Sequence, residues 1–401
     1  MRDEGTGPRD WATTTAFDRV AEVILGTRPE DIPEEVLGHA AHLLLDTLGV
    51  AAASSGMEAG RIARDAASRH MAAGDGAPSA PLLFDGRTVG LPGAVYAAAT
   101  QTDNLDAHDG YNPVKGHIGV VAAPTLIALA TALPHLSGRE ALAALVIGYE
   151  VGARAGQALH ATTPDYHTSG AWNALAVAAM AIRLRGGDGA VLKQALGIAE
   201  FHGPRSQMMR EIAHPTMLHD GSGWGAQAGM MAALLAETGF EGAPAITIEG
   251  TEVEEFWRDF GSAWLILDQY IKPYPVCRWA HAAIEGAREL RLRHHLTADD
   301  IAEIHIASFE KATNLFPGMP ATTGAAQYSL PFAVAQMLKT GELTVSHIDG
   351  PALSDPVVGR LVAATHMTVE ERFETRFPTE RCAEVTVVLN DGRRLTSGEI
   401  T

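Results

Sequence analysis

The densest group of ionisable side chains lies within residues 102–119, TDNLDAHDGYNPVKGHIG, between two apolar helical patterns. Its members are Asp103, Asp106, His108, Asp109, Lys115 and His117. Loops that hold this many titratable groups beside Gly and Pro are often binding loops, so we expect a site here rather than a solvated loop. Asp and His also ligate zinc or iron. A metal site is the alternative, although no H-x-x-x-H or C-x-x-C spacing supports it.

A second group, DYHTSG at residues 165–170, directly precedes a long Ala-rich helical pattern. Thr168 or Ser169 can cap that helix, and the helix N-terminus favours a carboxylate nearby. His167 is then placed to act as an acid or a base beside that carboxylate. In the alternative interpretation, the His167 ring only satisfies a backbone carbonyl.

A third group, HDGSGWG at residues 219–225, begins with His219 and again precedes a helical pattern. Its glycines allow the backbone to approach a ligand closely, and the following helix N-terminus favours an anion. A single glycine-rich turn more often serves packing than recognition. This group alone therefore indicates little.

A fourth group, KPYPVCRWAH at residues 272–281, combines two prolines that restrict the backbone with three cationic side chains. Lys272, Arg278 and His281 suit carboxylate binding, and a guanidinium can grip a carboxylate with two hydrogen bonds. The alternative is an interdomain linker whose charges face water. For Cys277 we expect a packing or pocket-wall role, because nothing in the sequence indicates the lowered thiol pKa of a nucleophile.

Together these groups predict proton transfer on a small carboxylate. Histidine is the natural proton carrier near neutral pH. Removal of a proton next to a carboxylate needs such a base together with cations that stabilise the enediolate. The two cysteines are too few for a disulfide framework or for the three thiolates of an iron–sulfur cluster. We therefore expect catalysis by side chains alone, without a metal or other cofactor.

Helical elements must position the first three groups. A Pro-Glu-Glu start and the spacing of the leucines predict a helix over residues 33–50. Ala-rich helical patterns separated by short Gly, Pro or Asp breaks follow at 92–102, 119–132, 138–159, 170–185, 189–201 and 222–238. The sequence thus predicts one large all-α domain over residues 11–265.

The pattern changes after residue 268. Alternating β-branched residues predict strands at 301–309 and 383–390, and Asn-Asp-Gly at 390–392 is a hairpin signal. A helix is predicted between them at 329–339. We therefore predict a mainly α protein in which a smaller α+β lid domain, residues 269–401, packs on the helical domain, with a hinge near 268–273.

Composition limits the possible partners. The 401 residues suffice for two domains, and 46% hydrophobic with only 6% aromatic residues favours helices packed through small side chains. The net charge of -18 and the lack of a Lys/Arg run exclude nucleic acid as a partner. The N-terminal residues lack an apolar signal region, and apolar stretches fall short of the roughly 20 residues that span a bilayer. We expect a cytoplasmic protein without a membrane partner.

Several of these segments occur in the order typical of one family. They are LLLDTLGVAAASSG, KGHIG, AALVIGYEVGARAGQALH, the helix after His167, LHDGSGWGAQAGMMAALLAETGF, KPYPVCRWAH and AAQYSLPFAVAQML. From about residue 17 to 395 the chain resembles the MmgE/PrpD family of dehydratases, decarboxylases and epimerases. The resemblance implies a homodimer of two-domain subunits with the site in the cleft between the domains.

The resemblance also implies site residues, by comparison with the cis-aconitate decarboxylase branch. The catalytic positions fall on Asp106, His117, His167 and Tyr328, with Asp103 competing for the aspartate position. The substrate-binding positions are expected at Asp103, His108, Lys115, His219, Lys272, Cys277, Arg278 and His281. Two positions depart from that branch. The expected lysine before Leu218 is replaced, since the sequence reads HPTM at 214–217, and Cys277 stands where the first hinge histidine is expected.

The missing lysine argues against cis-aconitate decarboxylation and against iminodisuccinate epimerisation. We therefore predict a cofactor-independent lyase, similar to a dehydratase, that abstracts a proton α to a carboxylate and expels a β-substituent. An epimerase or isomerase that returns the proton to the opposite face is the alternative. A non-catalytic member of the family and a metal-dependent hydrolase are further alternatives from other classes.

Overall fold

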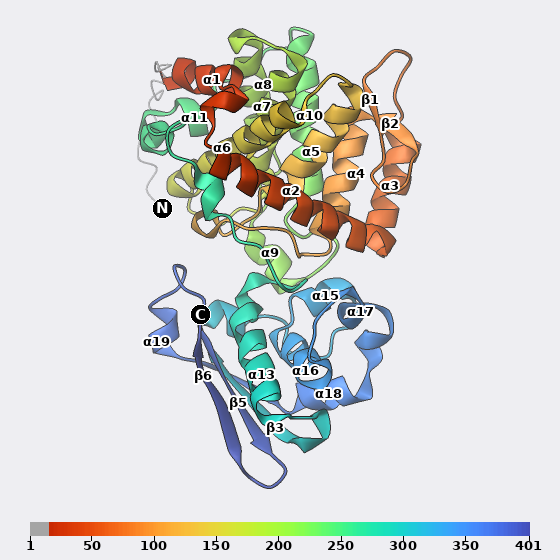
Figure 1. Ribbon diagram of the computed structural model, residues 1–401, viewed down its shortest axis with the longest axis vertical. Coiled ribbons are helices and arrows are strands. Elements are labelled where there is room, and N and C mark those ends of the chain that lie inside the picture. Colours follow the sequence, from red (N-terminus) through yellow and green to blue (C-terminus); the bar gives the residue numbers. More distant parts are fainter. Residues whose placement is uncertain (1–15) are drawn as a thin grey trace, which may run out of the picture.

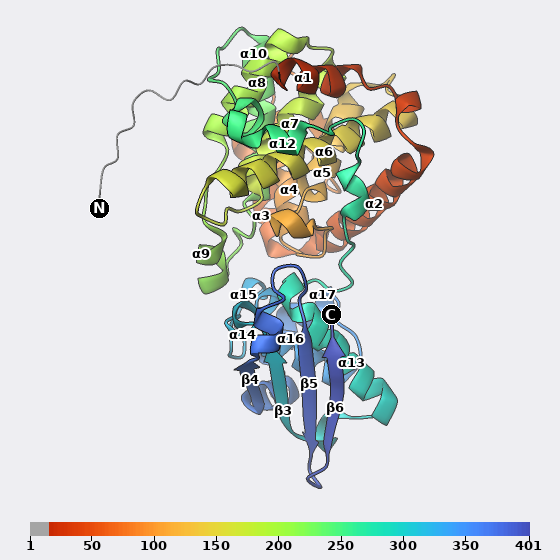
Figure 2. The ribbon, with the colours of Figure 1, turned by 90° about the vertical axis from the view of Figure 1, so that its left-hand side faces the viewer.

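The computed structural model describes residues 16–401, and residues 11–15 of the predicted helical domain lie outside the described residues. Two lobes stand one above the other, a helical lobe formed by the first two thirds of the chain and a smaller lobe that contains a sheet (Figure 1). The view from the side shows the same division (Figure 2). The predicted mainly α fold is confirmed.

Twelve α-helices form the described part of the helical lobe. They are α1 Ala16–Gly26, α2 Glu34–Ala53, α3 Glu58–His70, α4 Leu91–Asp103, α5 Gly119–Ala132, α6 Gly138–Thr162, α7 Gly170–Arg185, α8 Gly189–His202, α9 Met208–Ala213, α10 Ser222–Glu237, α11 Ile246–Glu249 and α12 Glu254–Trp257. Every helix predicted in this region is present. The sequence analysis did not predict α1 and α3, nor the short helices α9, α11 and α12.

Helix α7 is the centre of the helical lobe. Its residues 170–182 are all buried, and α6, α8 and α10 pack around it. Small residues make this close packing possible, because a Cβ on Gly225 or Gly229 of α10 would collide with the backbone of α7. The N-termini of α7 and α10 are thereby held side by side, and the Gly170 N–H donates to the Asp220 carbonyl at 3.0 Å.

A small hairpin adds to the helical lobe. Strands β1 Ser79–Pro81 and β2 Thr88–Gly90 pair antiparallel, and the connecting turn contains Gly86 at φ +86°. The sequence analysis read this region as purely helical. Three-residue strands are too short to show an alternating pattern, which explains why they were not predicted.

The lid lobe contains seven α-helices and four strands among the described residues. They are α13 His281–His294, β3 Ile301–Ser308, α14 Glu310–Thr313, α15 Thr323–Gln327, α16 Leu330–Thr340, α17 Val345–Ile348, α18 Pro356–Ala363, β4 Thr365–Val369, α19 Glu371–Glu374, β5 Ala383–Leu389 and β6 Arg394–Ile400. The strand order is β4-β3-β5-β6, parallel between β3 and β4 and antiparallel elsewhere. The predicted strands correspond to β3 and β5, and β4 was not predicted.

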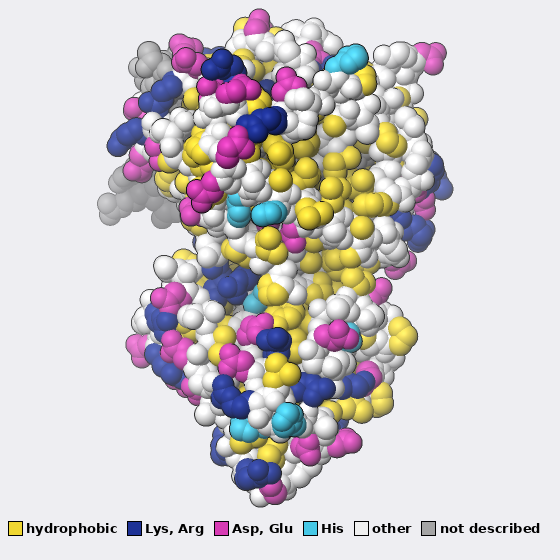
Figure 3. All heavy atoms as spheres, in the orientation of Figure 1, with side chains coloured by type: hydrophobic (Ala, Val, Ile, Leu, Met, Phe, Trp, Pro, Cys, Tyr) yellow, Lys and Arg dark blue, Asp and Glu magenta, His cyan; other side chains and the backbone are white. Residues whose placement is uncertain are grey.

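One described helical segment, Glu34–Gly56, is long and apolar enough to cross a membrane by length and composition, with a mean hydropathy of 1.4. Its α2 part buries Val36, Leu37 and Leu43 in the core of the helical lobe. The same helix exposes Leu45 (70%). Apolar side chains also gather over α2 on the face that Figure 3 shows. The absence of a membrane partner and the homodimer both stay predictions.

Backbone and side-chain contacts join the two lobes. Leu105, Met208 and Ile212 of the helical lobe pack into the hydrophobic core of the lid. Gly110 and Tyr270 exchange two backbone hydrogen bonds, at 2.9 and 3.0 Å. These contacts place the loop after α4 directly against the hinge.

Candidate active site

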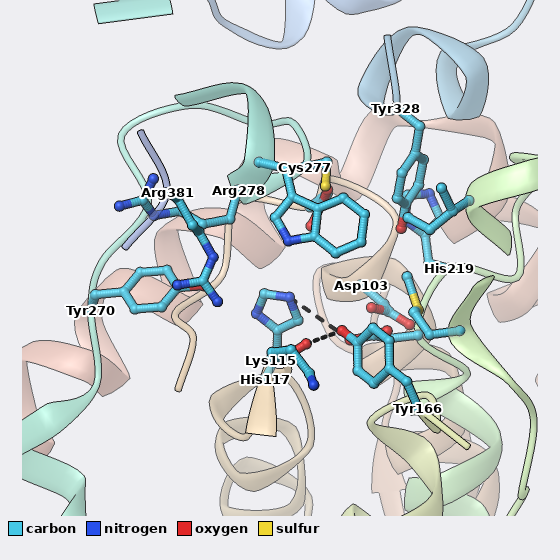
Figure 4. A pocket seen from close by; sticks show the side chains of 15 residues that line it. Asp103, Lys115, His117, Tyr166, His219, Tyr270, Cys277, Arg278, Tyr328 and Arg381 are labelled. Atoms are coloured by element: carbon cyan, nitrogen blue, oxygen red, sulfur yellow. Dashed lines mark hydrogen bonds and ion pairs between the residues drawn. The ribbon is translucent and has the colours of Figure 1, made fainter. Parts of the chain in front are cut away.

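A cavity lies where the loop after α4 meets the hinge and the lid (Figure 4). Its lining residues come from both lobes and are largely polar. They are Asp103, Asp106, Lys115, His117, Tyr166, Met208, Ile212, His219, Asp220, Tyr270, Cys277, Arg278, Trp279, Tyr328 and Arg381. The structure thus brings together eight of the twelve predicted site residues. The other four are His108, His167, Lys272 and His281.

Three lining residues have a strained backbone. Asp106, Lys115 and His219 adopt φ angles of +53°, +50° and +45°, which side-chain-bearing residues rarely adopt. Such strain persists only where surrounding contacts impose it, and it gathers at functional sites. The loop after α4 and the turn before α10 are therefore fixed in shape.

His117 presents an unprotonated ring nitrogen to the cavity. Its Nδ1 lies 2.5 Å from the Asp109 carbonyl oxygen, and only an N–H can form that bond. Nε2 is then the nitrogen with the lone pair, 3.8 Å from Asp220 Oδ2. Burial, followed by the neighbouring His108 and Lys272, lowers the pKa of His117 well below its usual value. The ring is neutral at pH 7 and can act as a base.

Asp109 orients His117 through its carbonyl, and its own side chain is held by two hydrogen bonds. Its Oδ1 accepts the Gly119 N–H at 3.1 Å, and its Oδ2 accepts the Tyr149 hydroxyl hydrogen bond. Burial raises the pKa of Asp109 to about 7. The side chain therefore anchors the start of α5, while the carbonyl of the same residue orients His117.

Two buried carboxyl groups lie on the same side of the cavity. Asp103 Oδ2 accepts the Ser222 N–H at 3.1 Å, and Asp103 Oδ1 lies 3.3 Å from His108 Nε2. Asp220 Oδ2 accepts the Ser169 hydroxyl at 2.6 Å. Burial raises the pKa of both groups. The Asp103 charge also raises the pKa of Asp220, and two buried carboxyl groups that repel each other do not ionise together, so one of them holds a proton.

The third aspartate, Asp106, is an anion engaged in an ion pair. Lys272 Nζ donates to Asp106 Oδ1 at 2.6 Å, and the Lys272 side chain is fully buried. Burial acts to raise the pKa of Asp106, but Lys272 together with the neighbouring His117, His108 and His219 outweighs it, and the pKa lies below its usual value. Lys272 therefore neutralises Asp106 and does not line the cavity.

Three cations line the cavity, and within residues 16–401 none of them forms an ion pair with a carboxylate. Arg278 and Arg381 lie together beside Tyr270, whereas Lys115 lies beside His117 and Tyr166 (Figure 4). Arg278 lies over the Tyr270 ring at 5.5 Å, and Lys115 over the Tyr166 ring at 4.9 Å. Arg381 is only 4% exposed, donates to Asn112 Oδ1 at 2.6 Å, and has no partner for its Nε. Unused donors on buried cations favour an anionic ligand.

Tyrosines and a thiol complete the lining. The Tyr166 hydroxyl donates to the Lys115 carbonyl, and the Tyr328 ring lies 5.7 Å from the His219 ring. Burial, and then the Asp106 charge, raises the pKa of Cys277 to about 12. Cys277 is thus a neutral thiol, which fits the predicted role as pocket wall.

His167 lies outside the cavity. Its Nδ1 donates to the Asp165 carbonyl at 2.8 Å, and its ring stacks on His160 with centroids 6.4 Å apart. This arrangement corresponds to the alternative interpretation of the sequence. The neighbouring Tyr166 points into the cavity instead (Figure 4). The expected cap also differs, because the Ser169 hydroxyl donates to Asp220 and accepts the His117 N–H, and it accepts no N–H of α7.

His108 and His281 also stand behind the lining. The His108 ring packs edge-on against His117 with centroids 4.4 Å apart, so it supports the base without touching the cavity. His281 Nε2 lies 3.1 Å from the Val276 carbonyl, to which it donates. Both rings therefore support the residues that line the cavity and do not line it themselves.

The segment that replaces the expected lysine lies beside the cavity. Thr216 and Met217 line an apolar groove that shares Asp103 with the cavity and also contains Leu218 and Trp224. Neither side chain can supply a charge there. Among the described residues, no group of three or more His, Cys, Asp or Glu could hold a metal ion.

Sequence reasoning missed Tyr166, Asp220, Tyr270 and Arg381 as lining residues. Asp220 and Tyr166 lie within groups that the sequence analysis singled out, so the local density of polar residues did indicate the right segments. Arg381 stands alone in the sequence, and no local pattern identifies it.

Comparisons with known proteins agree with this architecture. The MmgE/PrpD N-terminal domain matches residues 18–254, and the MmgE/PrpD C-terminal domain matches residues 274–401. The chain is similar to "Cis-aconitate decarboxylase-like protein oryM" of Aspergillus oryzae, 22% identical over 91% of this chain and 82% of that protein. It is also similar to "Cis-aconitate decarboxylase" of Aspergillus terreus, 24% identical over 92% of this chain and 81% of that protein. The chain belongs to the MmgE/PrpD family.

Proposed function

We propose that this protein is a cofactor-independent lyase that removes a proton α to a carboxylate of a small acid and expels a β-substituent. Membership of the MmgE/PrpD family and two relatives named as cis-aconitate decarboxylases support an enzyme that acts on a small carboxylate. The decisive observation is a neutral imidazole that faces a cavity lined by unpaired cations.

His117 is the base in this proposal. Its tautomer leaves the Nε2 lone pair toward the cavity, and its lowered pKa keeps that lone pair available at neutral pH. A weakly basic imidazole removes a carbon-bound proton only when the product anion is stabilised. The site must therefore stabilise an enediolate close to His117.

Arg278, Arg381 and Lys115 provide that stabilisation. Arginines suit the two oxygens of a carboxylate, and cations in a buried site act more strongly than cations in water. Burial, and then the charges of Lys311 and Arg381, lower the pKa of Lys115. An arriving carboxylate relieves this repulsion between like charges. The charge that develops on the substrate in the transition state is thus met by charges already in place.

Elimination would give a role to more of the side chains that line the cavity than epimerisation would. An epimerase needs a second proton carrier on the opposite face of the reacting carbon, and Arg278 and Arg381 cannot serve because they stay protonated. Lys115, whose pKa is lowered, is the group that would have to serve. Asp220 lies beside His117 and can protonate a departing hydroxyl. We therefore keep epimerisation as the second candidate.

The test uses purified protein and NMR in deuterated water. The panel contains citrate, cis-aconitate, malate and aspartate, which differ in carboxylate number and leaving group. We expect deuterium to replace the α-proton of at least one hydroxy acid, together with loss of water. Exchange without net elimination would point to the epimerase. If no compound exchanges a proton, the proposed function is wrong.

A further inference from the structure

Asp220 is a buried carboxyl group beside the proposed base for which the sequence analysis assigned no role. It is 5% exposed, lines the cavity and lies in the turn that precedes α10. Its carbonyl accepts the Gly170 N–H at 3.0 Å, and its Oδ2 accepts the Ser169 hydroxyl at 2.6 Å. Backbone and side chain are thus both held, which fixes the carboxyl group against the cavity.

Its surroundings favour the protonated form. The titratable groups that face it are Asp103, Asp106, His117, Tyr166, Lys272 and Tyr328. The cation among them, Lys272, is engaged by Asp106, and His117 is neutral. Asp103 accepts a backbone N–H and lies near His219, and both stabilise a negative charge, whereas Asp220 has one hydroxyl. Of the two carboxyl groups, Asp220 is therefore the one that keeps a proton at neutral pH.

We propose that Asp220 is the general acid that protonates the departing hydroxyl, and that His117 then returns a proton to it. This inference rests on the proposed function. Asp220 Oδ2 and His117 Nε2 are 3.8 Å apart, too far for a hydrogen bond in the resting site. That separation leaves each group free to contact a substrate atom, and the water released by the reaction can bridge the two groups afterwards and relay the proton.

The proposed cycle balances without another reactant. His117 takes the α-proton, and the electrons of the C–H bond form the carbon–carbon double bond. The C–O bond breaks toward oxygen, which takes the Asp220 proton and leaves as water. The imidazolium then gives its proton to the Asp220 carboxylate. Both groups return to their starting states, and the net products are an unsaturated acid and water.

Tyr328 is the rival acid, because it also lines the cavity from the lid. Burial, followed by Asp106, raises the pKa of Tyr328 well above its usual value, so it is a much weaker acid than Asp220. Two other hydroxyl groups nearby are engaged, because Ser169 donates to Asp220 itself and Tyr166 donates to the Lys115 carbonyl. The Tyr270 hydroxyl is a weaker acid than Asp220, because burial raises its pKa to about 12.

The experiment compares a leaving group that needs a proton with one that does not. Wild type, Asp220→Asn and Tyr328→Phe are each assayed with malate and with 2-chlorosuccinate, for elimination and for α-proton exchange in deuterated water. For Asp220→Asn we expect malate elimination to fall at least ~100-fold, the lower end of the usual effect of a general acid. Chlorosuccinate elimination and proton exchange should fall less than about tenfold, because chloride leaves unprotonated.

Two further measurements keep the proposal open to refutation if Asp220→Asn does not fold. Asp220→Glu retains an acid and should keep more malate elimination than the Asn variant. In wild type, malate elimination should decline as pH rises above neutral and Asp220 loses its proton, whereas chlorosuccinate elimination should not. Asp349→Asn is the matched control, because Asp349 also accepts a hydroxyl hydrogen bond at 2.6 Å, from Thr323, away from the cavity.

Equal losses on both substrates in Asp220→Asn would show a merely structural role. The same leaving-group selectivity in Tyr328→Phe would assign the acid to Tyr328 instead. Either result overturns the inference while wild-type turnover still supports the proposed function. If wild type neither exchanges protons nor eliminates from any compound of the panel, the proposed function itself fails.

Discussion

The two sides of the cavity differ in chemistry and in origin. The helical lobe supplies His117, Asp103 and Asp220, which are able to carry protons, together with the cation Lys115. The hinge and the lid supply Arg278 and Arg381, which hold permanent charge. Each proton-carrying side chain forms a hydrogen bond with the backbone or with a neighbouring hydroxyl, whereas Arg381 engages Asn112 with one donor and leaves its Nε unpartnered.

This difference indicates a division of labour between the lobes. Groups that exchange protons must be held in one orientation, and groups that bind a charged ligand must keep donors free for it. Changes on the helical side should therefore lower kcat, while changes on the lid side should raise KM. The predictions below challenge this division, beginning with the largest effect.

Replacement of the proposed base should have the largest effect. His117→Gln removes the lone pair but keeps a polar side chain of similar size, so kcat should fall by about 10² to 10⁴ while KM changes little. Steady-state kinetics and α-proton exchange measure this. His305→Gln, on the exposed part of β3, is the control. A variant that retains kcat would remove His117 from the mechanism.

The next largest effect is on stability. Lys272→Met leaves the buried Asp106 carboxylate without its partner, and loss of one member of a buried pair costs about 3–5 kcal/mol. Urea unfolding at pH 7 measures the free energy of unfolding, and the double variant Lys272→Met, Asp106→Leu should recover much of the loss. Because the folded pKa of Asp106 is lowered, the pair stabilises the protein above the unfolded carboxyl pKa. That contribution disappears as pH falls through the folded pKa, so the cost of Lys272→Met should shrink in acid.

A smaller effect is expected on the lid side. Arg381→Gln removes a charged donor from the anion-binding side, so KM should rise about 10- to 100-fold, as expected for a charge-assisted hydrogen bond of about 1.5–3 kcal/mol. Arg393→Gln, at the exposed β5–β6 turn, is the matched control. A loss confined to kcat would contradict the division between the two sides.

The smallest effect is expected at His167, where the role assigned from the sequence and the role indicated by the structure differ. The sequence analysis placed the acid or base at His167, whereas the structure turns that ring toward His160 and the Asp165 carbonyl. We expect His167→Ala to change kcat by less than about threefold, because no proton-transfer path from the cavity reaches its ring. A loss as large as that of His117→Gln would restore the original assignment.

The long helices could be predicted because their apolar periodicity persists over several turns. Helices α5 and α7 begin and end at the predicted residues, since Gly-containing breaks mark their limits. Strands β1, β2 and β4 could not be predicted, because three to five partly exposed residues carry too little pattern. Their pairing depends on partners elsewhere in the chain.

The site was predictable only where its residues are dense in sequence. The loop after α4 revealed Asp103, Lys115 and His117 by its unusual charge content. Arg381 and Tyr270 reach the cavity through tertiary packing, and no local signal marks them. The choice between Tyr166 and His167 depends on which neighbour faces inward in an extended segment, where successive side chains point to opposite sides.

The hydrogen bond that orients His117 has a consequence for how this site tolerates sequence change. Its acceptor is the main-chain oxygen of residue 109, and every amino acid carries that oxygen. No single substitution at 109 can delete the acceptor; it can only displace the loop that carries it. The protonation pattern of the imidazole is therefore encoded in the path of the backbone, and relatives with other side chains at this position can preserve it.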